Sequence, residues 1–505
     1  MAILGKVIKT AIELKQTLTP EMKDAREAQE TQLRNLLEKA KNTAFGTYYG
    51  FSTILDSEDL IATYQEKVPL HDYDKINERW WQQQQIESDI TWPGKPDFFA
   101  LSSGTTGKTS KRIPVTKEML ASFRSVGISQ AECLANYDLP ADVFEKDILM
   151  LSSSADLARH NGHLEGEISG INTSNLPAWF NGFYKPGLEI AQIDDWDERV
   201  SAIAEAAPEW DVVAIAGIPS WVKMMLETII RRHQLKNIHE LWPNLSIYAS
   251  GGVAFEPYRS SLEKLLARPL IYMDTYLASE GFFAFTARPD TLQMKMALDH
   301  GIFYEFIPFD ETGFDETGEL LDNPKICTIS EVEEGKDYAL SVSTPAGAWR
   351  YMIGDTVKFK DLESFEFVIS GRTKYFLNVV GAQLSEEKIN QAMKSLAEAF
   401  DLPINEFAVA AVQNNQEEYI HQWVIGAEGN ADENQLKSKL DEILQSLNKN
   451  YAVARKKALK DIKVKLVTTQ EMYHWLETRK KKGGQIKMPK VMKAEMMEDL
   501  LAFLD

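Results

Sequence analysis

A loop that combines hydroxyl, glycine and basic residues follows a short apolar segment near residue 100. It reads FFALSSGTTGKTSKRIPVT from Phe98 to Thr116. Glycine lets the backbone come close to an anion, while hydroxyl groups, backbone N–H groups and lysines supply hydrogen bonds and positive charge. The loop therefore predicts a site for phosphate groups. Its candidate binding residues are Ser102, Ser103, Gly104, Thr105, Thr106, Gly107 and Lys111.

This loop differs from the Walker loop of many ATP-binding proteins. A Walker loop has a glycine at a fixed spacing before its Gly-Lys pair, and that position here is Ser102. Clusters of glycine, serine and threonine also occur in solvated turns. The loop by itself leaves both interpretations open, and the other motifs decide between them.

Two later segments end an apolar strand in small residues, where a ligand can approach the backbone. One is IYASGGVAFEPY, which contains Gly252, and the other is IYMDTYLASEGFFAF, which contains Tyr276 and Glu280. Tyr276 could stack on a nucleotide base. Glu280 could hold Mg²⁺, which favours one or two carboxylates together with substrate phosphate. A core tyrosine and a glutamate in a solvated turn are the alternative interpretations.

Two more segments carry charged side chains in turns. In WRYMIGD, Asp355 could accept hydrogen bonds from a ribose diol, as carboxylates do in dinucleotide-binding folds. The alternative is an Asx-turn. The segment KKKGGQIKMPK, from Lys480 to Lys490, is rich in lysine although the chain is acidic. A lysine there could stabilise charge that develops on phosphorus, whereas the ordinary interpretation of a charge run is a solvated surface.

The elements that must position these residues predict an α/β fold. Helical stretches such as Trp221 to His233 separate short apolar strands, which is typical of a largely parallel sheet. The expected strands are 98–101, 148–151, 212–216, 245–250 and 270–275. Shorter strands, broken by glycine and acidic residues, follow near 301–367 and predict a small β-subdomain.

The character of the chain changes again after residue 370. The pattern predicts helices at 385–400 and 434–450 and strands at 406–413, 419–427 and 462–467. We therefore expect a large N-terminal α/β domain, residues 1–370, whose sheets are mainly parallel. A smaller, mobile α+β domain of residues 371–505 should follow it.

Charge and cysteine content narrow the class of protein. The chain has 505 residues, 55 Lys and Arg against 75 Asp and Glu, and a net charge of -20, which disfavours nucleic acid and membrane surfaces as partners. Cys133 and Cys327 lack metal-type spacing, so neither a disulfide framework nor a zinc site is expected, and a reducing cytoplasm fits. Residues 1–18 predict an amphipathic helix rather than a signal peptide, and no membrane span is expected.

These motifs, in this order, resemble those of the adenylate-forming superfamily. The closer resemblance is to its acyl-acid amido synthetases, the auxin-responsive Gretchen Hagen family and its bacterial relatives. The superfamily's aromatic-x-x-(Ser/Thr)-Glu signature resembles Tyr276 to Glu280, its phosphate loop resembles 102–111, and its ribose motif resembles 351–355. Its hinge segment resembles 371–381, and the tail at 484–490 favours the amido-synthetase branch. The chain departs from the family pattern at Trp349, Met352 and Lys490.

The resemblance implies an AMP-forming ligase that uses ATP and Mg²⁺ to join a small carboxylic acid to an amino acid or another amine. It implies that Lys487 and Glu280 are catalytic, that Glu280 holds the metal, and that nucleotide contacts include Ala278, Ser279 and Arg372. An acyl-CoA ligase, or a nucleotide-binding sensor without catalysis, is the alternative. The acid, the amine and the oligomeric state stay open.

A segment between the motifs is a candidate lining of the acid pocket. It runs from Leu151 to Asn172, after an expected strand, and contains Arg159, His160 and His163. These cationic or titratable side chains could contact a carboxylate. Solvated loop residues are an equally good interpretation.

Overall fold

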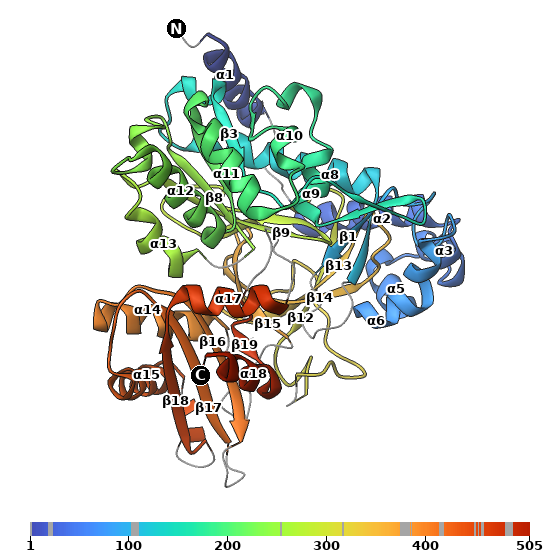
Figure 1. Cartoon of the computed structure of the whole chain (residues 1–505). Helices are drawn as coiled ribbons and strands as arrows, with labels where there is room; N and C mark the ends of the chain where they lie inside the picture. Colours follow the sequence, from blue (N-terminus) through green and yellow to red (C-terminus); the bar gives the residue numbers. More distant parts are fainter. Residues whose placement is uncertain are drawn as a thin grey trace.

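The computed structural model describes most of the chain. The described residues are 3–18, 24–102, 111–252, 255–315, 318–373, 384, 386–413, 419–448, 451–452, 454–455, 459–479 and 488–504. Figure 1 shows a large N-terminal part, coloured blue to yellow, above a smaller C-terminal part in orange and red.

An eleven-stranded mixed sheet runs through the described N-terminal part. Its order is β12-β13-β14-β15-β11-β10-β9-β8-β7-β3-β6. Its strands are β3 (Asp147–Met150), β6 (Tyr184–Lys185), β7 (Val212–Gly217), β8 (Ile247–Gly251), β9 (Ile271–Ala278), β10 (Gly281–Phe285), β11 (Met294–Met296), β12 (Phe303–Pro308), β13 (Asp337–Ser343), β14 (Tyr351–Asp361) and β15 (Glu366–Arg372). The pairs from β6 to β9 are parallel, and those from β9 to β12 are antiparallel. The strands expected near 301–367 thus continue the main sheet and do not form a separate subdomain, and among the described residues most strand pairs of this sheet are antiparallel, not parallel as expected.

Helices cover the parallel half of the sheet. On one face lie α11 (Trp196–Ala206), α12 (Pro219–His233) and α13 (Glu256–Glu263), and Tyr248 of β8 packs into their apolar cluster. The adjacent Ile247 packs with Met273 in a separate cluster on the other side, as expected because side chains alternate along a strand. Pro219 begins α12 and three basic residues end it, which suits the helix dipole.

A second sheet holds the strand at residue 98. Its order is β2-β1-β5-β4, with β1 (Phe98–Ser102), β2 (Lys111–Val115), β4 (Ala158–His160) and β5 (His163–Gly166). The expectation that residues 98–101 belong with the parallel strands of the main sheet is wrong. Antiparallel pairing with β2 draws β1 out of that sheet, and a β-propensity pattern does not specify which strand is the partner.

Helices and short turns complete the N-terminal part. The helices are α1 (Ile3–Leu18), α2 (Ala25–Ala40), α3 (Ala44–Tyr48), α4 (Phe51–Leu55), α5 (Leu60–Lys67), α6 (Tyr73–Ile76), α7 (Gln82–Gln84), α8 (Lys117–Glu132), α9 (Ile168–Ser174) and α10 (Leu188–Ala191). The predicted N-terminal helix is confirmed by α1. No helix among the described residues combines the length and the apolar character needed to cross a membrane.

The C-terminal part contains a four-stranded sheet in the order β18-β17-β16-β19. Its elements are α14 (Glu386–Phe400), β16 (Ile404–Gln413), β17 (Tyr419–Ala427), α15 (Glu433–Leu447), β18 (Asp461–Val467), α17 (Thr469–Arg479), β19 (Val491–Met492) and α18 (Ala494–Leu504). The predicted helices and strands of this region are confirmed. Side chains of β16, α17 and α18 share an apolar cluster with α12 and α13, and Figure 1 shows α17 facing the N-terminal part. The domain boundary at residue 371 stays a prediction.

Candidate functional site

One large cavity, of about 1900 Å³, brings the sequence motifs together. It is lined by strand ends of both N-terminal sheets and by α17 and residues 488–493 of the C-terminal part. Every described residue that was predicted to contact the nucleotide or the metal lines this cavity: Ser102, Lys111, Gly252, Tyr276, Ala278, Ser279, Glu280, Asp355 and Arg372. The predicted residues Ser103, Gly104, Thr105, Thr106, Gly107 and Lys487 lie outside the described residues. Met488, which follows Lys487 in the chain, lines the cavity.

Asp355 is the centre of a hydrogen-bonded group in the cavity wall. Its Oδ2 accepts a 2.7 Å hydrogen bond from the Tyr276 hydroxyl, and its Oδ1 is 2.9 Å from Nε of Arg372. Asp355 and Arg372 face each other in the register of β14 and β15. Tyr276 is buried and makes an edge contact with Phe283. Burial and the Asp355 charge raise the pKa of Tyr276 well above its usual value, so the hydroxyl keeps its proton and donates.

Glu280 lies in the tight turn between β9 and β10, on the same side of the cavity. It is buried, and burial raises the pKa of its carboxyl, while the nearby Lys111 charge opposes that shift. The register pairs Lys111 with Ser102 at the end of the β1–β2 hairpin where residues 103–110 connect the two strands. The phosphate-loop ends therefore stand beside a desolvated carboxylate, which needs cationic compensation.

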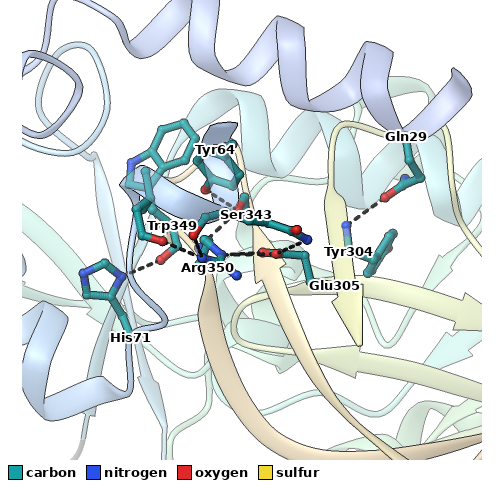
Figure 2. Close-up of polar contacts among 10 residues, drawn as sticks. Gln29, Tyr64, His71, Tyr304, Glu305, Ser343, Trp349 and Arg350 are labelled. Atoms are coloured by element: carbon teal, nitrogen blue, oxygen red, sulfur yellow. Dashed lines mark hydrogen bonds and ion pairs between the residues drawn. The ribbon is translucent and has the colours of Figure 1, made fainter. Parts of the chain in front are cut away.

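Arg350, directly before β14, is buried and does not line the cavity. Figure 2 shows its guanidinium against Glu305, with Nε 2.9 and 3.1 Å from the two carboxylate oxygens. Its Nη1 donates to the backbone carbonyls of Gln65 and Val68. The arginine thus ties the N-terminal helices to the strand that carries Asp355.

The contacts around Arg350 also hold an unusual backbone conformation of this residue. Arg350 has φ of 45°, in the left-handed region that non-glycine residues rarely adopt. Its N–H donates to the Ser343 hydroxyl at 3.1 Å, and its carbonyl accepts from the backbone N–H of His71 at 2.8 Å. Ser343 is also bonded to the Tyr64 hydroxyl (Figure 2). Buried hydrogen bonds on both sides of the residue therefore hold the start of β14.

Family models match this chain in three segments. "GH3 family N-terminal domain" matches residues 14–204, "GH3 family central domain" matches 295–372, and "GH3 family C-terminal domain" matches 387–496. The chain belongs to the GH3 family. The resemblance seen in the motifs is confirmed.

Curated relatives match this GH3 chain over part of their length. Indole-3-acetic acid-amido synthetase GH3.2 of Arabidopsis thaliana is 24% identical over 171 residues, 32% of this chain and 31% of that protein. Indole-3-acetic acid-amido synthetase GH3.4 of the same plant is 23% identical over 53% of this chain and 47% of that protein. The chain thus spans about a third to a half of these relatives.

Solved structures match the whole fold. A GH3.15 acyl acid amido synthetase has a TM-score of 0.77 and 16% identity, over 98% of this chain and 96% of that one. A 2-hydroxyisobutyryl-CoA ligase in the postadenylation state has a TM-score of 0.59 and 12% identity, over 96% of this chain and 93% of that one. These matches confirm the predicted fold class.

The GH3 cavity extends into an apolar pocket on the open side of the parallel strands. Met150, Ala216, Ala249 and Met273 lie side by side in the register of β3, β7, β8 and β9, and all four line the cavity. Helix α8 contributes Leu120, Phe123 and Ile128 to the same lining. The two alanines leave room between the methionines, so the wall is both apolar and recessed.

The structure does not bring Arg159, His160 or His163 to the cavity. They belong to β4 and β5 of the second sheet, where His163 is bonded to Glu165 and Arg159 and His160 are exposed. The structure therefore does not support them as acid contacts, whereas Leu151, Ile168 and Asn172 of the same predicted segment line the cavity. Arg159, His160 and His163 form a hairpin that pairs with β1, a long-range pairing that the sequence pattern did not indicate.

Sequence reasoning missed Asp274, although it stands inside the motif that contains Tyr276. It lines the cavity, and its Oδ1 is buried without a hydrogen-bond partner among the described residues. Burial, with the Glu256 charge, raises the pKa of Asp274 to about 7, and only Arg259 and Ser250 oppose this. An aspartate two residues before an aromatic at a strand end was the available signal.

We expect Asp274 to make stability depend on pH. Its folded pKa is above its usual 3.8, so its contribution is present below about pH 4 and is lost as pH rises towards 7. Asp274→Asn should therefore be more stable than the parent at pH 8, and the difference should shrink at pH 4. Urea denaturation at both pH values measures this. A difference of the same size at both would contradict the assignment.

Proposed function

We propose that this GH3 chain uses ATP to convert a small carboxylic acid into its acyl-adenylate, and then transfers the acyl group to the amine of an amino acid. The observation that carries the proposal is the meeting of Asp355, Arg372, Glu280 and Lys111 in one cavity. The names of the relatives support it, since they are amido synthetases for indole-3-acetic acid and, in Nicotiana attenuata, a jasmonoyl–L-amino acid synthetase.

The geometry suits a nucleotide. Each oxygen of Asp355 accepts one hydrogen bond within the protein and retains lone-pair capacity for a ribose hydroxyl. Arg372 lines the cavity and is half-exposed, so its guanidinium can contact a ligand there. The carboxylate of the acid then attacks the α-phosphorus and pyrophosphate leaves, a reaction that needs no protein nucleophile. Positioning and charge stabilisation supply the catalysis.

Glu280 suits a magnesium ion. Its carboxylate is buried in the cavity wall near the charges of Lys111 and Arg372, and Mg²⁺ is usually bound by one or two carboxylates together with substrate phosphate. No group of three His, Cys, Asp or Glu side chains gathers as a metal site within the described ranges, so the phosphates would complete the ligand set. When bound, the ion would neutralise phosphate charge. We propose Lys487 as the lysine that stabilises the charge developing on the α-phosphate.

The apolar pocket favours an acid with a bulky apolar body. We expect Ala216→Leu to raise KM about tenfold for acids with a ring or a branched chain, because the leucine fills the recess between Met150 and Ala249. Acetate, which does not reach the recess, should keep its KM and serves as the internal control. An equal rise for both acids would place the acid elsewhere. Steady-state AMP formation measures the effect.

The reaction requires ATP, and we propose that it takes place in the cytoplasm. Cys133 and Cys327 are free thiols, which suits a reducing compartment.

Incubation with ATP, Mg²⁺ and pooled acids, with pooled amino acids or with coenzyme A, tests the proposal by mass spectrometry. AMP together with an amide is the expected result. AMP with a thioester would instead identify an acyl-CoA ligase, and ADP would exclude adenylation. ATP binding without turnover would identify a nucleotide sensor.

A further inference from the structure

A buried glutamate joins the two parts of the molecule beside the cavity. Glu406 of β16 has 3% of its surface exposed. It accepts a 2.8 Å hydrogen bond from the hydroxyl of Tyr258, on α13 of the N-terminal part. It also accepts hydrogen bonds from the Tyr473 hydroxyl, on α17, and from Nζ of Lys490 at 2.6 Å. One carboxylate therefore binds three donors from three different segments.

The charge of this group is balanced within the interface. A buried carboxylate is costly unless it is paired and fully hydrogen-bonded. Lys490, with 12% of its side chain exposed, supplies the counter-charge and lies 4.3 Å above the Phe407 ring. Burial and Glu406 raise the pKa of Tyr258 well above its usual value, so its hydroxyl remains a donor. The surrounding apolar cluster includes Tyr258, Ala408 and Met488.

Both ends of this contact reach the candidate site. Tyr258 belongs to the helix that follows Gly252, and it lines the cavity itself. Lys490 and Met488 line the cavity from the other side, in the segment directly after Lys487. The Glu406 contact thus sets the distance between two parts of the cavity wall. One part lies near the nucleotide motifs, and the other is the segment that follows the proposed catalytic lysine. Other pairs between the two parts, such as Lys223 with Glu428, lie nearer the surface.

We propose that Glu406 is a positioning residue that holds the C-terminal part in the orientation used for adenylation. This inference rests on the proposed function. In that orientation residues 488–493 line the same cavity as the motif residues. We expect the transfer of the acyl group to the amine not to depend on this contact. Breaking it should therefore separate the two half-reactions.

Tyr258→Phe is the sharpest test, because it removes only the hydroxyl that bridges the two parts. We expect exchange of pyrophosphate into ATP, which reports adenylation, to fall about tenfold in kcat with little change in KM for ATP. Amide formation from supplied acyl-adenylate and amine should keep its rate. Tyr272→Phe is the matched control: its hydroxyl bonds Glu263 at 3.0 Å within the N-terminal part, so both half-reactions should be unchanged.

Two further measurements separate positioning from folding. Lys490→Arg should recover most of the exchange rate lost in Lys490→Met, since arginine restores the cation beside Glu406. In the protein without substrates, Tyr258→Phe should speed hydrogen exchange in residues 256–263 and 469–479 but not in 212–217. An equal fall of both half-reactions, or unchanged hydrogen exchange, would overturn the inference. If the parent protein forms no adenylate at all, the proposed function fails, while hydrogen exchange still tests the contact.

Discussion

Replacing Asp355 by alanine is expected to lower ATP-dependent AMP formation by roughly 10²–10³-fold, the usual loss when a preorganised polar group of an active site is removed. The carboxylate orients both the Tyr276 hydroxyl and the Arg372 guanidinium. Loss of this carboxylate therefore removes a proposed hydrogen-bond acceptor for the ribose. It also removes the group that orients Tyr276 and Arg372. The ratio kcat/KM for ATP, from coupled AMP detection, measures the effect.

Asp361→Ala is the matched control for this variant. Asp361 ends the same strand and is not part of the cavity lining. We expect it to retain activity within a few-fold. Thermal unfolding should show both variants folded. Normal AMP formation by a folded Asp355→Ala protein would contradict a nucleotide role for this cavity wall.

Arg350→Met should destabilise the protein by about 3–5 kcal/mol, because it leaves Glu305 as an uncompensated buried charge. Both side chains are almost fully buried, at 2% and 1% exposure. The variant also loses the hydrogen bonds to the carbonyls of Gln65 and Val68. Denaturation in guanidinium chloride, with ΔG extrapolated to water, measures the change.

Two comparisons sharpen this second prediction. Arg34→Met breaks an ion pair with Glu30 in which both side chains are largely exposed, so it should cost at most about 1 kcal/mol. The double variant Arg350→Met/Glu305→Met should recover much of the loss, because it removes the unpaired charge as well. If Arg350→Met and Arg34→Met lowered the free energy of unfolding by the same amount, the buried pair would not be what holds β14.

The two predictions concern the same strand. The hydrogen bonds and the ion pair of Arg350 hold the residue directly before β14, and Asp355 lies within this strand. Met352, where the family pattern has a second arginine, lines the cavity between these points, and its backbone N–H donates to the His71 carbonyl. Variants that lose some of the contacts of Arg350 but remain folded should therefore have reduced activity.

The family of this protein, and the chemistry proposed for it, could be inferred from the sequence alone. The order of the phosphate loop, the Tyr276 to Glu280 signature and Asp355 indicated the family, because such motifs consist of particular residue types at short spacings. Periodicity also located several of the helices and strands, including β17 at Tyr419–Ala427. Such local patterns follow from backbone geometry and can be found without knowing the fold.

Which distant residues meet could be seen from the three-dimensional structure alone. β1 lies in a separate sheet, His163 lies away from the cavity, and Arg350 is paired with Glu305 outside the cavity lining. Tyr258 is bonded to Glu406 across 148 positions of the chain. Strand partners and buried ion pairs depend on long-range packing, and no short-range spacing in the chain encodes them.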